Sequence, residues 1–183
     1  KGQASKKNGG VLDYDDEELK SVISMLAGLS NSKGSALKTA DYVEELTNHR
    51  LAKNFDQKTS LYISMEALCG NEMDAKALQD KSKYFDKVNN SLKLSGPDVL
   101  WALGAYLDMN PGTKKFFAQL LKVVYDEEWA EEKTILEFYN DEEGEGTPAF
   151  VNAQQAAAPF LKWLAEAEED DDDDDDDDDE SDD

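Results

Sequence analysis

Residues 123–139 of the sequence, VVYDEEWAEEKTILEFY, place aliphatic and aromatic side chains on either side of a dense block of acids. Val124 precedes the block, and Ile135, Leu136 and Phe138 follow it at helical spacing. Apolar side chains with this period line the buried face of a helix. We therefore expect two helices that pack through these residues. The acids between them are Asp126, Glu127, Glu128, Glu131 and Glu132.

The acids of this block differ in how well a helix tolerates them. Glu131 and Glu132 fall in the first turn of the expected second helix, where negative charge is favourable. Residues 126–128 fall at the end of the preceding helix, where acids oppose the helix dipole and cost stability. An unfavourable local choice is a better sign of function than a favourable one. We therefore expect the first contact with a basic partner at residues 126–128.

A second aromatic and acidic segment, FLKWLAEAEE, occupies residues 160–169. Phe160, Trp163 and Leu164 share one helical face, and Lys162 can pair with Glu166 one turn later. Trp163 has two interpretations, as a core residue or as a partly exposed anchor within an interface. If the two segments lie side by side, they form one acidic patch edged by aromatic side chains. The second segment's candidate binding residues are Trp163, Glu166, Glu168 and Glu169.

The rest of the chain repeats the same helical pattern, without an alternating strand and hairpin signal. Short amphipathic helices joined by brief loops must stack in antiparallel pairs to bury their apolar stripes. We therefore expect an all-α fold, an α-solenoid of about eight antiparallel helices. The expected helices contain residues 19–26, 37–46, 61–68, 77–88, 99–107, 117–124, 131–140 and 150–164.

Capping residues and prolines predict where several of these helices begin. Ser35, Asp56 and Asp74 are candidate N-caps, because their side-chain oxygens can accept from free backbone N–H groups. Asn110 followed by Pro111 predicts the start of the helix through residue 124. Pro159 lies inside the last apolar pattern, where it removes a backbone donor. We expect a kink or a break there, with a short final helix starting at Pro159.

Charge is concentrated in two parts of the chain. The formal net charge is −23, from 42 Asp and Glu against 19 Lys and Arg. Residues 126–145 hold 10 acids and one base, and residues 166–183 hold 16 acids and no base. The remainder is close to neutral. Phosphate binding needs positive charge, so strong direct nucleic-acid binding is not expected, and a basic protein segment is favoured as partner.

Composition divides the chain into three regions. Residues 1–12 are predicted to be a flexible linker, residues 13–169 the helical domain, and residues 170–183 a disordered poly-Asp tail. The tail is interpreted either as a solubilising segment or as an electrostatic lure for basic surfaces. The sequence begins at Lys1 without a signal peptide, and we expect it to be a piece of a longer protein. The apolar runs are shorter than the ~20 residues of a membrane span.

Residue types that support catalysis are scarce. His49 and Arg50 are the chain's only histidine and arginine, and they fall in a polar stretch without a phosphate loop. Cys69 is the only cysteine, which fits a reducing compartment, and we interpret it as a buried structural thiol. The acidic run 141–146 lacks the spacing of a calcium loop. We therefore expect no enzyme activity, no metal site and no cofactor.

The two segments resemble a known pair of motifs. LLKVVYDEEWAEEKTILEFY at residues 120–139 and PFLKWLAEAEEDD at residues 159–171 are similar to the two aromatic/acidic boxes of a domain family that closes eukaryotic translation initiation factor 5. The epsilon subunit of factor 2B ends in the same type of box. The resemblance is strongest over residues 110–171, and it implies an all-helical HEAT-type fold. A tryptophan usual near the end of the first box is replaced here by Phe138 or Tyr139.

The resemblance implies an adaptor of translation initiation in the cytoplasm. Domains of this family hold initiation factor 2 through lysine-rich boxes of its beta subunit. They also contact initiation factors 3 and 1, which helps to build the preinitiation complex on the small ribosomal subunit. The GTPase-activating part of factor 5 lies in an N-terminal region that this sequence does not contain. Two alternatives stay open: a nucleotide-exchange domain of the 2B epsilon type, and an acidic-tail chaperone for basic proteins.

Overall fold

A computed structural model describes residues 12–140 and 143–171, and the side chains of residues 168–171 are not included in that description. Apart from residue 12, the predicted linker lies outside the described residues, as does most of the predicted poly-Asp tail. Within them the chain forms α-helices, two short 3₁₀ helices and turns, which confirms the all-α prediction. The α-helices are α1 (Glu17–Lys33), α2 (Thr39–Lys53), α3 (Gln57–Cys69), α4 (Ala75–Asp80), α5 (Ser82–Leu92), α6 (Gly96–Met109), α7 (Phe117–Asp126), α8 (Glu132–Asn140) and α9 (Phe150–Asp171), and the 3₁₀ helices are η1 (Gly34–Ala36) and η2 (Pro111–Phe116).

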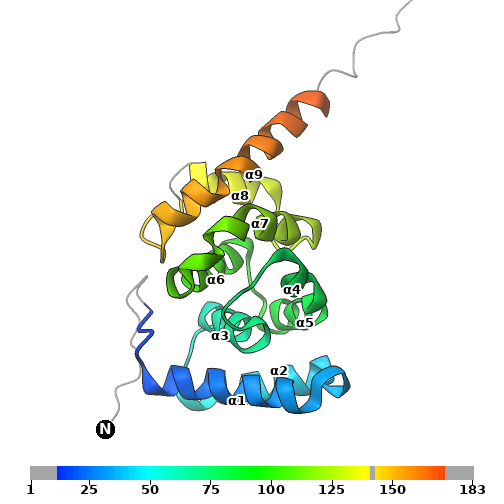
Figure 1. The fold of residues 1–183 in the computed structure, drawn as a ribbon, viewed down its shortest axis with the longest axis vertical. Coiled ribbons are helices and arrows are strands. Elements are labelled where there is room, and N and C mark those ends of the chain that lie inside the picture. The colour runs from blue at the N-terminus through cyan, green and yellow to red at the C-terminus, as the bar shows by residue number, and fades with distance from the viewer. Residues whose placement is uncertain (1–11, 141–142, 172–183) are drawn as a thin grey trace, which may run out of the picture.

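The helices stack in layers along the long axis of the molecule (Figure 1). α1 and α2 form the layer at one end, and α3 packs on α1. α6 packs on α3, while α7, α8 and α9 form the opposite end. Each apolar stripe is therefore covered by the next layer, as expected for stacked helix pairs. This arrangement places the two aromatic/acidic boxes together at the end farthest from α1 and α2.

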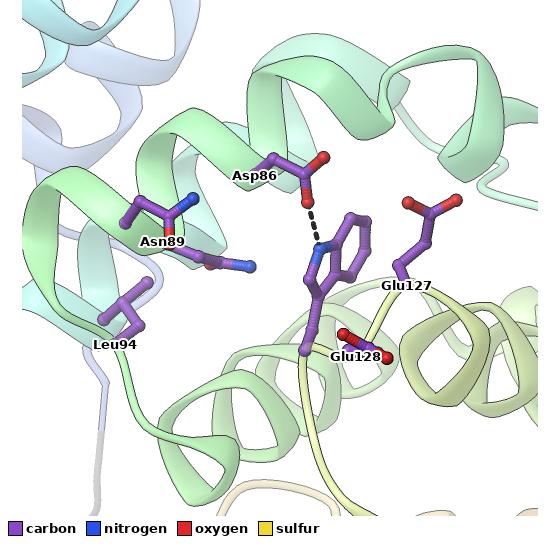
Figure 2. A pocket seen from close by; sticks show the side chains of 7 residues that line it. Asp86, Asn89, Leu94, Glu127 and Glu128 are labelled. Carbon is purple, nitrogen blue, oxygen red and sulfur yellow. Dashed lines mark hydrogen bonds between the residues drawn. The ribbon is translucent and has the colours of Figure 1, made fainter.

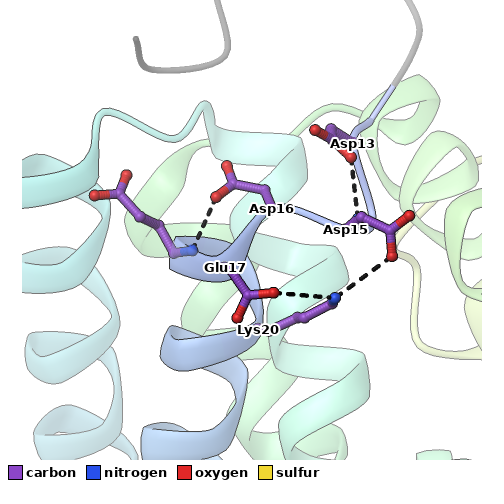
Figure 3. Close-up of polar contacts among 6 residues, drawn as sticks. Asp13, Asp15, Asp16, Glu17 and Lys20 are labelled. Carbon is purple, nitrogen blue, oxygen red and sulfur yellow. Dashed lines mark hydrogen bonds and ion pairs between the residues drawn. The ribbon is translucent and has the colours of Figure 1, made fainter. Parts of the chain in front are cut away.

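Acids organise the start of the first helix (Figure 3). The side chain of Asp16 caps α1 by accepting from the Glu18 N–H at 2.8 Å. Lys20 forms ion pairs with Asp15 and Glu17 at 3.4 and 3.5 Å. These charges lie near free N–H groups and the positive end of the helix dipole. The acidic run before the first apolar stripe therefore has a structural role.

Buried tyrosines tie the layers together through their hydroxyl groups. The Tyr84 hydroxyl donates to the Leu37 carbonyl at 2.6 Å, which joins α5 to the segment before α2. The Tyr106 hydroxyl donates to the Gly70 carbonyl and accepts from the Met73 N–H at 3.1 Å. Burying a hydroxyl costs free energy unless it is paired, so these contacts help to fix how α6 lies against the α3–α4 turn.

Of the three candidate N-caps Ser35, Asp56 and Asp74, two are confirmed and one is wrong. Asp56 accepts from the Thr59 N–H and Asp74 from the Ala77 N–H, each at 2.8 Å. Ser35 does not cap α2, because it lies within the 3₁₀ turn η1 and α2 begins after Lys38. The 3₁₀ turn η1 lies between α1 and α2, in the segment between two helices expected from the sequence.

The helix predicted over residues 77–88 is two helices. α4 ends at Asp80, and the turn at Lys81 has N–H to carbonyl bonds of the tighter i→i−3 type on both sides. No glycine or proline marks this break. The turn lets Tyr84 reach the Leu37 carbonyl while Phe85 is fully buried. Tertiary packing therefore overrides the continuous helical pattern.

Proline positions are also read incorrectly from the sequence. Asn110 does not cap a helix, because its amide donates to the Glu66 carboxylate at 2.6 Å and to the Tyr106 carbonyl at 3.0 Å. Pro111 starts η2, and α7 begins only at Phe117. Pro159 neither ends α9 nor starts a new helix, since α9 runs through it. Because proline has no N–H, the Gln155 carbonyl one turn earlier receives no hydrogen bond from Pro159. Both residues are exposed, so water can bind this carbonyl instead.

Candidate partner-binding site

The acidic block begins in the turn that ends α7. The Trp129 N–H donates to the Val124 carbonyl at 2.9 Å, and the Glu128 N–H donates to the Tyr125 carbonyl at 3.0 Å. These two bonds define a Schellman C-cap. Its left-handed residue is Glu128, with φ of 58°, at a position where glycine is preferred. Glu128 is therefore unfavourable in charge and in backbone conformation, which sharpens the sequence-based hint of function.

This turn forms one wall of a small open cleft against α5 (Figure 2). Its volume is about 260 Å³. Glu127 and Glu128 reach it from the turn, and Asp86 reaches it from α5 (Figure 2). The Trp129 indole N–H donates to Asp86 Oδ1 at 2.5 Å, while the ring packs 5.8 Å from Phe85. Three carboxylates therefore converge on a cleft with an aromatic floor.

The other side of the same turn meets α9. The Tyr125 ring lies edge-on to Phe160 and Trp163, with centroid distances of 6.2 and 6.0 Å. Phe160 is buried and stacks on Trp163, whereas 44% of the Trp163 surface is exposed. Lys122 places its ammonium 5.5 Å from the Trp163 ring centroid. We call this contact between the boxes the α7–α9 seam.

The aromatic parts of the two boxes therefore lie side by side, but the first-box acids are divided. Asp126 faces the seam through Lys122, with an Nζ–Oδ2 distance of 2.7 Å, whereas Glu127 and Glu128 line the α5 cleft. Glu131 is exposed just before α8, and Glu132 is the first residue of that helix. The predicted place in the first helical turn is confirmed for Glu132, whereas Glu131 precedes that turn.

The second box is less fully described. Trp163 is partly exposed, as in the second of its two interpretations, so the interpretation of it as a core residue is wrong. Glu166 pairs with Lys162 at 3.7 Å, as the i,i+4 spacing predicts. Glu168 and Glu169 lie within α9, but their side chains are outside the described part of the chain. The core predictions for Val124, Ile135 and Phe138 hold, and Leu136 is partly buried against the same core.

Sequence reasoning missed the side chains that complete both contacts. Asp86 and Asn89 line the cleft from α5, about 40 residues before Trp129, and no local pattern links them. Lys122 and Tyr125 had a signal, since Asp126 falls four residues and Tyr125 three residues after Lys122, so both are neighbours of Lys122 on the helix surface. What the spacing could not show is that α9 brings Trp163 to that face.

The residues considered for catalysis are not arranged as a catalytic site. His49 and Arg50 are partly buried near the end of α2, far from both boxes along the stack. Burial raises the pKa of the Cys69 thiol to about 12, and Sγ lies 4.0 Å from the Ala77 carbonyl oxygen. A thiol with this pKa is a poor nucleophile at neutral pH. Among the described residues no group of three or more His, Cys, Asp or Glu side chains is placed to hold a metal ion.

Residues 97–174, which contain both boxes, match the model of the W2 family, described as eIF4-gamma/eIF5/eIF2-epsilon. This segment is therefore similar to the W2 family. A solved structure of the C-terminal domain of translation initiation factor 5 at low pH is similar in fold, with a TM-score of 0.61 and 18% sequence identity. The match covers 90% of this chain and 100% of that chain. No curated protein matches the chain.

These two findings confirm the resemblance drawn from the boxes, and the fold is the HEAT-like one expected. The W2 segment begins inside α6, so α1–α5 are related to the factor 5 domain by fold rather than by the family model. The family description names translation initiation factors. In the part of the chain that the structure describes, no helix has the length and apolar character to cross a membrane.

Proposed function

We propose that this chain is an adaptor domain of translation initiation that binds lysine-rich protein segments through its two aromatic/acidic boxes. The partner that we propose is the lysine-rich part of the beta subunit of initiation factor 2, with initiation factors 3 and 1 as further partners. In this role the domain acts in the cytoplasm and helps to assemble the preinitiation complex on the small ribosomal subunit. It holds its partners together and performs no chemistry itself.

The observation that carries this proposal is the meeting of the boxes at the α7–α9 seam. Tyr125 of the first box contacts Trp163 of the second, and Asp126 lies one residue beyond Tyr125. An exposed aromatic ring beside carboxylates suits a lysine side chain, because the ring face attracts the ammonium and the acids complement its charge. The W2 match supports the proposal because it spans both boxes.

The proposed contact is electrostatic, so salt and charge reversal test it. A lysine-rich peptide should bind the full chain with an affinity that falls steeply as ionic strength rises. Replacing Asp126, Glu127 and Glu128 together by Lys should weaken binding by roughly tenfold or more, since each lost pair exchanges attraction for repulsion. Circular dichroism should still show the helical signal. Unchanged affinity in the triple variant would remove these acids from the site.

A matched control comes from the other end of the stack. Asp41, Glu44 and Glu45 are exposed on α2, so their replacement by Lys alters the net charge by the same amount. This variant should bind the peptide with nearly the affinity of the unmodified chain. An equal loss from both triple variants would mean that overall charge, and no particular surface, holds the peptide.

The alternative functions are separated by two further measurements. The family description also names an epsilon subunit, which keeps nucleotide exchange in view. Faster release of labelled GDP from factor 2 at saturating concentrations of this chain would favour exchange over an adaptor role. Deleting residues 170–183 tests the acidic-tail chaperone, because only that function loses all peptide binding when the tail is removed.

A further inference from the structure

Lys122 occupies the surface that the proposed function assigns to a partner's lysine. Its ammonium lies 2.7 Å from Asp126 Oδ2 and 5.5 Å from the centroid of the Trp163 ring. It therefore touches one carboxylate of the first box and the exposed aromatic ring of the second. These are the two kinds of group that recognise an ammonium ion on a protein surface.

Three other lysines in the described part of the chain form ion pairs at the same i,i+4 spacing, and the first of them, Lys76, pairs with Asp80 at 2.6 Å through a side chain that is 80% exposed. Lys133 pairs with Glu137 at 3.6 Å and Lys162 with Glu166 at 3.7 Å, each at the same i,i+4 spacing. Their side chains are 82% and 77% exposed, against 52% for Lys122. Among the described residues, neither ammonium lies over an aromatic ring. Lys122 has the least exposed side chain of these four lysines, and it alone among them contacts both boxes.

We propose that Asp126 and Trp163 form a lysine subsite, and that Lys122 is its internal occupant until a lysine of the partner displaces it. The inference rests on the proposed function and adds a competition to it. Phe160 and Tyr125 support the subsite by holding the Trp163 ring from α9 and α7. Binding of a lysine-rich segment then costs the Lys122 contacts, which lowers the affinity and favours segments with several lysines over a single one.

The competition predicts that removing the Lys122 charge strengthens binding. Lys122→Met keeps the long apolar stem beside the ring and removes the ammonium. An exposed ion pair and a surface cation–π contact are both weak, so we expect about a fivefold gain in affinity for an octalysine peptide. Lys122→Arg retains a cation on the subsite and should leave the affinity close to that of the unmodified chain.

Lys133→Met is the matched control. It makes the same change in net charge and frees Glu137 on the neighbouring helix α8, but it touches no aromatic ring. A gain confined to Lys122→Met supports the subsite. Equal gains in the two variants, or a loss in Lys122→Met, overturn it, because both follow from net charge or from structural support alone.

A nuclear magnetic resonance titration follows the displacement directly. Carbon-labelled lysine side chains report on Lys122, whose ε-methylene signals are displaced by the nearby Trp163 ring and identified by their absence in Lys122→Met. Octalysine should move these signals towards the positions of the other lysines. Binding that leaves them in place overturns the inference but not the adaptor function. No binding of octalysine to any variant removes the adaptor function itself.

Discussion

Tyr125 of α7 and Trp163 of α9 lie edge to face, with ring centroids 6.0 Å apart. This contact joins two segments that are separated by α8 and nearly forty residues of sequence. It places the exposed Trp163 ring over the same helical turn that ends in Asp126. The acids of the first box therefore act beside an aromatic surface that the second box supplies.

Trp163 and its neighbour Phe160 should respond differently to truncation. Trp163 is 44% exposed, so Trp163→Ala should cost about 1 kcal/mol of stability, the worth of its aromatic contacts, while it abolishes the seam. Phe160 is 5% exposed, and Phe160→Ala should cost ~3–5 kcal/mol. Urea denaturation measures both changes. A larger loss of stability from Trp163→Ala would place that ring in the core and remove it from the binding surface.

Glu128 should trade stability for function. Glycine at this position relieves the left-handed backbone conformation and removes an acid from the negative end of the α7 dipole. Glu128→Gly should therefore raise the free energy of unfolding by about 1 kcal/mol and weaken binding of a lysine-rich peptide. Lys93 has φ of 53° at the end of α5, and Lys93→Gly is the control. It should stabilise the fold without weakening the peptide complex, and a similar loss of binding there would contradict the assignment.

Two glycines predict opposite effects of the same substitution. A Cβ at Gly104 of α6 would lie 2.7 Å from the Pro148 carbonyl oxygen, a backbone atom in the turn before α9. Gly104→Ala should cost ~1–3 kcal/mol because this contact cannot relax cheaply. Gly28 of α1 has no atom within 4 Å of the same position, so Gly28→Ala should stabilise by ~0.5–1 kcal/mol. Thermal denaturation of the two variants tests whether α6 packs on that turn.

Glu66 makes stability depend on pH. Burial raises the pKa of its carboxyl group, and the hydrogen bond from Asn110 only partly opposes this. The folded state therefore binds the proton more readily than the unfolded chain, and stability falls as pH rises from about 4 through the raised pKa. Glu66→Gln stays neutral and should be more stable than the unmodified chain at pH 7, with the difference shrinking towards pH 4.

The control for this effect is Glu72, which is exposed in the turn between α3 and α4. Thermal midpoints of Glu66→Gln and Glu72→Gln, measured between pH 4 and 8, separate burial from the general loss of a negative charge. A difference between Glu66→Gln and the unmodified chain that grows as pH falls would reverse the assigned direction of the pKa shift.

The sequence predicted those features that depend on neighbours within one or two turns. The caps at Asp56 and Asp74 and the pairing of Lys162 with Glu166 needed only local spacing. The break at Lys81 did not follow from local signals, because Tyr84 reaches a carbonyl 47 residues earlier. The bond from Trp129 to Asp86 also spans distant helices.

In the candidate site, too, the features set by local spacing were predicted and those set by distant helices were not. Spacing identified the acids and aromatic residues of each box, and the family match spans both boxes. It did not show that Glu128 adopts a left-handed conformation, since no glycine or asparagine marks that position. Nor did it show that Asp126 and Glu127 face different sides of the turn. Both facts depend on where α5 and α9 lie relative to α7.

The three tryptophans give the most direct test of the two-box surface, because each indole N–H gives its own proton–nitrogen signal. Trp129 reports on the α5 cleft and Trp163 on the α7–α9 seam, while Trp101 is buried in α6 away from both. Single Trp→Phe variants assign the signals. A lysine-rich peptide should shift the Trp129 and Trp163 signals together and leave that of Trp101 unchanged. Binding that moves neither Trp129 nor Trp163 would contradict the account.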